Sequence, residues 1–207
     1  MSEQTLVEIL NQHVPAASIP YCLGLWKQYP FHFKLRKRRI SKVGDFTIYP
    51  GRTPQITVNR DADPYLFLIT YIHEVAHLVV HRKYGNRIES HGQEWKMTFK
   101  ELMEPVLTEE VFPYALLAGL KKHLHNPKAS TFSDSKFTHL LRQYDTRHEN
   151  VILLSQLPEG SVFAYHGRWF RKGKLRRTRI ECCEMSSRAR YLVPADAPVS
   201  HAQLSLL

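Results

Sequence analysis

One short stretch limits what this chain can fold into more than any other. Residues 70–80 read Thr-Tyr-Ile-His-Glu-Val-Ala-His-Leu-Val-Val, so two histidines and a glutamate stand in an otherwise apolar segment. On a helix, residues four apart lie on the same face about 6 Å apart, so His73 and His77 can direct two imidazoles at one ion. Polar side chains buried without partners are costly. The stretch therefore predicts a metal-binding helix rather than an ordinary core helix.

The glutamate between the two histidines suits a catalytic site. Glu74 follows His73 directly, so its carboxylate is rotated about the helix axis and can reach a water on the metal without binding the metal. Catalytic zinc takes three protein ligands and one water, whose pKa it lowers to about 7. A general base then has only to accept one proton as the water attacks a carbonyl. The H-E-x-x-H spacing thus predicts one Zn²⁺ ion and a hydrolase, with Glu74 as the base.

The third ligand is less constrained. His81 continues the four-residue spacing, but it lies about 12 Å along the helix axis from His73, which is too far for one ion. A metzincin would need glycine and histidine where this chain has Val80 and Lys83, which excludes that class. The remaining nearby candidates are His91, Glu89, Glu94 and Glu101.

Among these candidates we favour the histidine. Tyr84-Gly85-Asn86 ends the first helix and lets the chain turn back. Residues 90–95, Ser-His-Gly-Gln-Glu-Trp, are typical of the start of a second helix. His91 at that start can face the first helix across the turn, so His73, His77 and His91 form the expected ligand set.

These motifs together resemble the SprT-like (Spartan-type) zinc metalloprotease family. H-E-V-A-H at 73–77 is followed by Tyr84-Gly85 and by H-G-Q-E-W-K at 91–96, and the similarity extends from residue 56 to about residue 145. The resemblance implies that His73, His77 and His91 bind zinc and that Glu74 is the catalytic base. It also implies peptide-bond hydrolysis. Eukaryotic members digest proteins crosslinked to DNA, so DNA-associated proteins are the expected substrates.

The charge of the chain favours a polyanionic partner, with DNA as the expected one. Its 207 residues hold 29 Lys and Arg against 19 Asp and Glu, a net charge of +10. Two segments place basic residues near aromatic ones, as nucleic-acid surfaces do; their members are Arg36, Lys37, Arg38 and Arg39 in the first, and Trp169, Arg176, Arg177 and Arg179 in the second. A charge-protected edge strand explains the first segment equally well. A solvated face, or docking on acidic parts of the first domain, is the alternative for the second.

Other features concern the compartment. The N-terminus lacks the basic flank and apolar core of a signal peptide, and no apolar run approaches the roughly 20 residues of a membrane span. The three cysteines, Cys22, Cys182 and Cys183, make no disulfide framework. We therefore expect a cytoplasmic protein with no membrane partner, associated with the nucleoid if DNA is bound.

The patterns predict an α+β fold: a zincin-like minimal metalloprotease domain of helices and a small antiparallel sheet, followed by a small β-meander. Helices are predicted over residues 2–13, 18–29, 64–84, 92–103, 109–123 and 137–144, with Asp63 capping the third and an interruption near Pro113 in the fifth. Strands are predicted over 31–36, 46–49 and 55–59, and turns over 41–45 and 50–54. An edge strand beside such a helix can bind an extended peptide.

We expect three parts: a metalloprotease domain (1–125), a connector with a short helix (126–150) and a basic β-rich module (151–207). Strands over 162–170 and 175–183 with a turn at 171–174, and a further strand over 191–193, would form the last part. Many SprT-like proteins end there in a zinc ribbon with paired C-x-x-C motifs. Cys182-Cys183 is a single adjacent pair, so we predict a metal-free meander instead. The alternative to an enzyme is a non-catalytic nucleic-acid-binding protein with a structural zinc.

Overall fold

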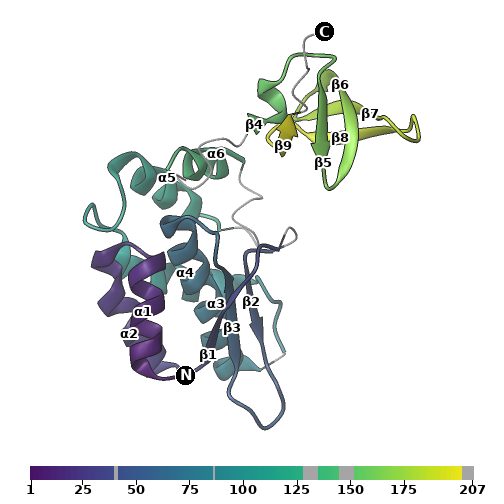
Figure 1. Cartoon of the computed structure of the whole chain (residues 1–207). Helices are drawn as coiled ribbons and strands as arrows, with labels where there is room; N and C mark the ends of the chain where they lie inside the picture. Colours follow the sequence, from purple (N-terminus) through teal and green to yellow (C-terminus); the bar gives the residue numbers. More distant parts are fainter. Residues whose placement is uncertain (40–41, 86, 128–134, 145–151, 202–207) are drawn as a thin grey trace. The chain divides into compact units, whose positions relative to one another are not determined.

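The computed structural model describes residues 1–39, 42–85, 87–127, 135–144 and 152–201. The chain divides into two compact units, 1–147 and 148–207, and the division falls inside the predicted connector. Helices dominate the first unit and strands the second, which gives the mixed α+β composition predicted (Figure 1). Within the described ranges, no helix is long and apolar enough to cross a membrane.

The first unit contains six α-helices and a three-stranded sheet among its described residues. Its elements are α1 (Glu3–His13), α2 (Ile19–Gln28), β1 (His32–Arg36), β2 (Gly44–Thr47), β3 (Gln55–Asn59), α3 (Pro64–Tyr84), α4 (Gln93–Met103), α5 (Tyr114–Leu124) and α6 (Ser135–Gln143). The predicted start of α1 is confirmed, because the Ser2 hydroxyl accepts a hydrogen bond from the Thr5 backbone N–H at 3.2 Å.

The sheet of the first unit is mixed rather than purely antiparallel. The strand order is β1-β3-β2, with β1 parallel and β2 antiparallel to β3. The predicted antiparallel sheet is therefore wrong in one pairing, because the chain passes over the end of β3 between β1 and β2 instead of forming a hairpin. The predicted strand 46–49 is also displaced, since β2 begins at Gly44, inside the segment predicted to be a turn.

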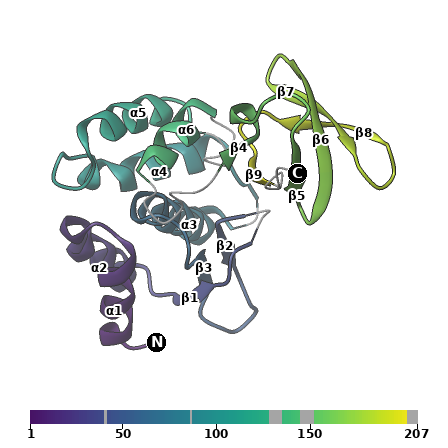
Figure 2. The same ribbon diagram turned by 45° about the horizontal axis from the view of Figure 1, so that its top comes forward.

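α3 is the central helix of this unit. Its first turn is capped by Asp63, whose Oδ1 accepts hydrogen bonds from the backbone N–H groups of Tyr65 (3.0 Å) and Leu66 (2.9 Å), as predicted. The helix contacts β2 and β3 on one side and α4 on another, and Figure 2 shows it between these elements. Apolar residues are consequently buried on several faces of α3, which explains its nearly continuous apolar sequence.

The predicted helix 109–123 begins later than expected. Residues before Pro113 form turns, in which the backbone N–H groups of Val111 and Phe112 both donate to the Thr108 carbonyl, and α5 starts at Tyr114. Proline disfavours helical geometry in the residue before it, so Phe112 cannot continue a helix into Pro113. Phe112 is instead fully buried in the core of the first unit.

The second unit is a six-stranded sheet with its own small core. Its strands are β4 (Ile152–Leu153), β5 (Val162–Tyr165), β6 (Arg168–Arg176), β7 (Arg179–Glu184), β8 (Arg190–Pro194) and β9 (Pro198–His201), in the order β4-β9-β5-β6-β7-β8. Consecutive strands β5 to β8 are neighbours, so this part is a meander. Its core includes Phe163, Phe170, Ile180 and Val193.

The predicted turn at 171–174 is wrong, because these residues lie inside β6. The pairing of β6 with β7 shifts register between Lys172 and Leu175. Gly173 marks the shift, since a Cβ atom there would lie 2.7 Å from the Glu181 carbonyl oxygen on β7. The chain reverses at two other places. His166 and Gly167, with φ angles of 50° and 74°, connect β5 to β6, and Arg177, with a φ angle of 53°, lies in the turn between β6 and β7. Such positive φ angles suit tight hairpin turns.

Candidate metal centre

Three imidazoles from two segments meet at one point of the first unit. The Nε2 atoms of His73 and His77 are 3.2 Å apart, those of His77 and His91 3.0 Å, and those of His91 and His73 3.3 Å. Three nitrogens bound to one tetrahedral ion at about 2.05 Å, the usual Zn–N distance, would stand about 3.3 Å apart. The three side chains therefore fit one metal ion. Among the described residues, His73, His77 and His91 form the one group of three or more His, Cys, Asp or Glu side chains that could hold such an ion.

The local sequence explains how a residue after the helix joins two residues on it. His73 and His77 are one turn apart on α3. Gly85 ends that helix with a φ of 64°, a conformation that glycine adopts without strain. The chain then returns through a turn in which the Gly92 N–H donates to the Glu89 carbonyl, and Gly92 is the N-cap of α4. His91 precedes that cap, which places its ring beside those of α3.

Aromatic packing fixes the orientation of the three rings. Trp95 of α4 is fully buried, and its ring centroid lies 4.6 Å from that of His73, 5.3 Å from that of His77 and 4.7 Å from that of His91. On β2, Phe46 is stacked parallel to His77, at 6.4 Å and 6°. Side chains held in this way keep their nitrogens converged before any ion is bound, which lowers the entropic cost of binding.

Burial also keeps the three histidines in the form that binds metal. Burial, followed by the neighbouring His77 and His91, lowers the pKa of His73 well below its ordinary value. Burial and His91 lower the pKa of His77 to about 3, and burial lowers that of His91. Neutral imidazole is the metal ligand, so protons compete little for these nitrogens at pH 7.

Glu74 is the buried carboxyl group of the site. Its residue is 6% exposed. Burial, with a smaller effect from Asp45, raises the pKa of Glu74 to about 8, while Arg39 and Lys42 act in the opposite direction. A cation bound beside it would also favour the carboxylate. This group is therefore poised to exchange a proton near neutral pH, which is what a general base requires.

A pocket opens over these groups and exposes them to a substrate. Its volume is about 290 Å³, and it is lined by Gly44, Asp45, Phe46, His73, Glu74, His77, Ser90 and His91. Strand β2 thus forms one wall, and α3 with the start of α4 forms the other. The arrangement can hold a metal ion with the buried carboxyl group beside it, and it leaves room for a ligand above both.

Sequence reasoning missed the β2 wall of the pocket. The sequence patterns predict a turn at Gly44 and Asp45 and an ordinary strand residue at Phe46. The missed signal was the alternation of side chains along a strand, with a period of two residues. Gly44 and Phe46 are two residues apart on β2 and both lie against α3, and they pair with Val58 and Ile56 on β3. Asp45 carries no sequence signal that would distinguish it from a turn aspartate.

Two other histidines near the motif lie outside the cluster. The ring of His81, on the last turn of α3, is 6.1 Å from that of Phe46. His123 of α5 is buried and stacked on Phe137 at 4.9 Å. Neither belongs to the group that could hold an ion.

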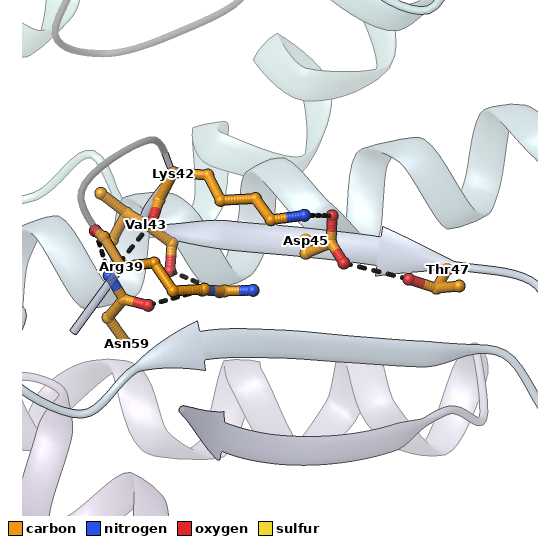
Figure 3. A network of polar contacts seen from close by, with 6 residues as sticks. All are labelled: Arg39, Lys42, Val43, Asp45, Thr47 and Asn59. Carbon is orange, nitrogen blue, oxygen red and sulfur yellow. Dashed lines mark hydrogen bonds and ion pairs between the residues drawn. The ribbon is translucent and has the colours of Figure 1, made fainter. Parts of the chain in front are cut away.

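The structure divides the first predicted nucleic-acid segment. Arg36 ends β1 and Lys37 follows it, and both residues are exposed. Arg38 forms an ion pair with Asp61 at 3.6 Å. Arg39 donates hydrogen bonds within the unit, to the side chain of Asn59 and to the backbone of Val43 (Figure 3). The segment thus presents Arg36, Lys37 and Arg38 to solvent, although Arg38 is paired, and uses Arg39 in internal contacts.

The second predicted segment lies on the sheet of the second unit. Trp169 is 49% exposed on β6, while Arg176 and Arg179 face each other across the β6–β7 hairpin with Arg177 at its turn. The Arg176 guanidinium is 3.4 Å from the Glu181 carboxylate. The structure thus gathers the three arginines at one end of a hairpin and leaves the indole of Trp169 accessible.

Known proteins resemble this chain over a short segment. It is 49% identical over 35 residues to the protein SprT of Pseudomonas putida and 38% identical over 45 residues to that of Pseudomonas fluorescens. These segments cover 17% and 22% of this chain, and only 21% and 27% of the two relatives. No family model matches the chain, and no solved structure matches it significantly. The similarity suggests a SprT-like protein, and the three convergent histidines independently indicate a metal site.

Proposed function

We propose that this chain is a zinc-dependent peptide-bond hydrolase of the SprT-like type. The observation that carries the proposal is the set of three neutral imidazole nitrogens at 3.0–3.3 Å spacing beside a buried carboxyl group, under an open pocket. A structural site would be closed, whereas a catalytic one keeps an open position. The short similarity to SprT proteins supports the same choice.

Each residue of the site has a role in that proposal. His73, His77 and His91 would hold Zn²⁺, which when bound acts as a Lewis acid and lowers the pKa of a water. The carboxylate of Glu74 accepts the proton that this water loses as it attacks the peptide carbonyl. The same carboxyl group then gives the proton to the leaving amine nitrogen. Trp95 and Phe46 keep the histidine rings in place.

The expected substrate is an extended polypeptide bound along β2. This strand is at the edge of its sheet, and within the described part of the chain no strand pairs with its outer side. An unpaired edge can accept a peptide as an additional strand. The net charge of +10 and the exposed arginines of the second unit favour substrates associated with DNA. A cytoplasmic location remains part of this proposal.

A single substitution tests the reaction. Glu74→Gln keeps the shape of the side chain but cannot accept a proton, so we expect cleavage to fall by about 10²–10⁴-fold while zinc content is unchanged. Protamine, a basic unfolded protein, serves as the substrate, with and without single-stranded DNA. Glu89→Gln, on the exposed turn before α4, is the matched control. Unchanged cleavage by Glu74→Gln would refute the assigned role.

The second candidate is a nucleic-acid-binding protein that keeps zinc for stability alone. The exposed Trp169 and the arginines at the β6–β7 hairpin favour it. Metal content cannot separate the two candidates, because both retain zinc. Salt-dependent binding of a DNA oligonucleotide by wild-type, zinc-loaded protein that cleaves nothing would favour this second function.

A further inference from the structure

Strand β2 lies so close to α3 that its first residue has to be glycine. A Cβ atom added to Gly44 would lie 2.5 Å from Thr70 Cγ2 and still closer to Glu74 Oε1. Neither distance is possible without a shift of the strand or of the glutamate. The backbone of β2 therefore rests directly on the carboxyl group that the proposed reaction needs.

One buried amide side chain holds the chain just before that glycine (Figure 3). Asn59, the last residue of β3, is 4% exposed. Its Nδ2 donates to the carbonyl oxygens of Arg39 (3.2 Å) and Lys42 (3.1 Å), and its Oδ1 accepts from Arg39 Nε (2.9 Å). All the polar atoms of this side chain are thus used on the chain that passes from β1 to β2.

The same connection is held a second time through Val43. Its carbonyl oxygen accepts from the Asn59 backbone N–H at 2.8 Å and from the Arg39 guanidinium at 3.2 Å. Val43 directly precedes Gly44, so these bonds fix the point at which β2 begins. Unbonded buried carbonyls are costly, which makes the arrangement resistant to sliding.

We propose that Asn59 and Gly44 are positioning residues of this hydrolase. Asn59 sets where β2 starts, and Gly44 lets the backbone of β2 lie against Glu74. Together they hold the free edge of β2, and a peptide bound along it, at a fixed distance from the base and from the three histidines. This inference rests on the proposed function. Neither residue binds the metal or moves a proton in the proposed reaction, so both act through the position of β2.

The need for this precision follows from strand geometry. A slip of one residue moves a strand by about 3.3 Å and turns every side chain to the opposite face. A misplacement of about 1 Å can already cost on the order of 100-fold in rate. A base held by α3 and a peptide held by β2 therefore need a fixed connection between the two elements.

Two inhibitors separate positioning from metal binding. Acetohydroxamate needs only the metal, whereas a tetrapeptide hydroxamate needs the metal and the edge of β2. We expect Asn59→Ala and Gly44→Ala in the full zinc-loaded chain to weaken the peptide hydroxamate by on the order of 10–100-fold. Binding of acetohydroxamate to Asn59→Ala should stay within about twofold, since Asn59 lies outside the pocket and the histidines on α3 and before α4 are untouched.

Two further variants serve as control and safeguard. Gly24→Ala in α2 is the matched control, because a Cβ atom there would meet nothing within 4 Å. Arg39→Gln removes the guanidinium bonds to Asn59 and Val43, together with a charge that acts on Glu74, and should cause a smaller loss in the same direction if Asn59→Ala does not fold.

The outcomes are distinct from those that test the proposed function. The positioning roles would be overturned if the variants lost affinity equally for both inhibitors, or lost none for either. They would also be overturned if the wild-type protein bound the peptide hydroxamate no better than acetohydroxamate. Absence of cleavage by zinc-loaded wild-type protein would instead overturn the hydrolase, and the inhibitor comparison does not depend on turnover.

Discussion

The candidate metal centre of the first unit and the β6–β7 hairpin of the second expose their polar groups to very different degrees. In the first unit, Glu74 and Asn59 are only 6% and 4% exposed, and their surroundings are held by α3 and β3. In the second, the side chains of Arg176 and Arg190 are 67% and 80% exposed around Glu181. Buried groups are positioned by packing, so their neighbours decide their chemistry. Exposed groups remain available to a large charged partner, and each contributes little alone.

The largest effect is expected when a ligand of the candidate metal centre is removed. His77→Ala should lower zinc affinity by more than the roughly 10–100-fold typical for loss of an outer partner, because it removes one of three direct bonds. Competition with a chromogenic chelator measures the affinity. His81→Ala, one turn further along α3 and outside the cluster, is the control. An equal loss for His81→Ala would contradict the assigned ligands.

A smaller effect is expected at the exposed indole of the second unit. Trp169→Ala should weaken binding of a fluorescent oligo-dT by about 1–3 kcal/mol if a base stacks on it. Fluorescence anisotropy at two salt concentrations gives the affinity and the salt slope. Tyr114→Ala, an aromatic residue that is 76% exposed in the first unit, is the control. Equal affinities for the wild type and Trp169→Ala would remove Trp169 from the proposed surface.

The buried glutamate also predicts a pH dependence of stability for the metal-free protein. The pKa of Glu74 rises from 4.5 to about 8 on folding, so its contribution is complete below pH 4.5 and is lost as pH rises through 8. Between pH 6.5 and 8 the folded state holds a proton that the unfolded state lacks. The contribution of Glu74 to the free energy of unfolding should therefore fall by about 1–2 kcal/mol over this range.

Urea titrations in a chelating buffer measure this change. The histidines act in the opposite direction, because free imidazole is still half protonated at pH 6.5: the lowered pKa of His77 alone adds a rise of about 0.4 kcal/mol between pH 6.5 and 8. The fall due to Glu74 is therefore measured as the difference between the wild type and Glu74→Gln, in which the histidine contribution cancels. Glu74→Gln should abolish the decline between pH 6.5 and 8. A decline that persists in this variant would assign it to another group.

The smallest effect is expected at Glu181, whose side chain is 27% exposed between two largely exposed arginines. Glu181 lies 2.9 Å from Arg190 and 3.4 Å from Arg176. Glu181→Gln should change the free energy of unfolding by less than about 1 kcal/mol, because exposed ion pairs contribute little. It frees two arginines, so oligonucleotide binding should strengthen slightly. Glu159→Gln on an exposed turn of the same unit is the control. A large loss of stability would show that this pair behaves like a buried one.

The sequence was most informative where the contacts that matter are local. The cap at Asp63, the helix that follows it and the one-turn spacing of His73 and His77 depend on residues a few positions apart. The path of the chain over β3 could not be predicted, because it depends on which strands pair. The position of Asn59 beneath that path has no signature in a single sequence.

Two glycines show the same limit. Gly44 and Gly173 were both assigned to turns, and both lie in strands where a neighbouring element leaves no space for a Cβ atom. The neighbour is α3 in the first case and β7 in the second. A glycine beside polar residues is typical of a turn, and only the three-dimensional contact distinguishes it from a site of close approach.

The indole beneath the three histidines has a practical consequence. Trp95 is one of three tryptophans in the chain, and its ring centre lies 4.6–5.3 Å from those of all three imidazoles. Excited indole transfers energy or an electron efficiently to an open-shell ion at such short range, whereas a filled-shell ion leaves its emission bright. Cobalt or copper loading would thus dim the intrinsic fluorescence, and displacement by zinc would restore it, so that occupancy can be followed by light without any added label.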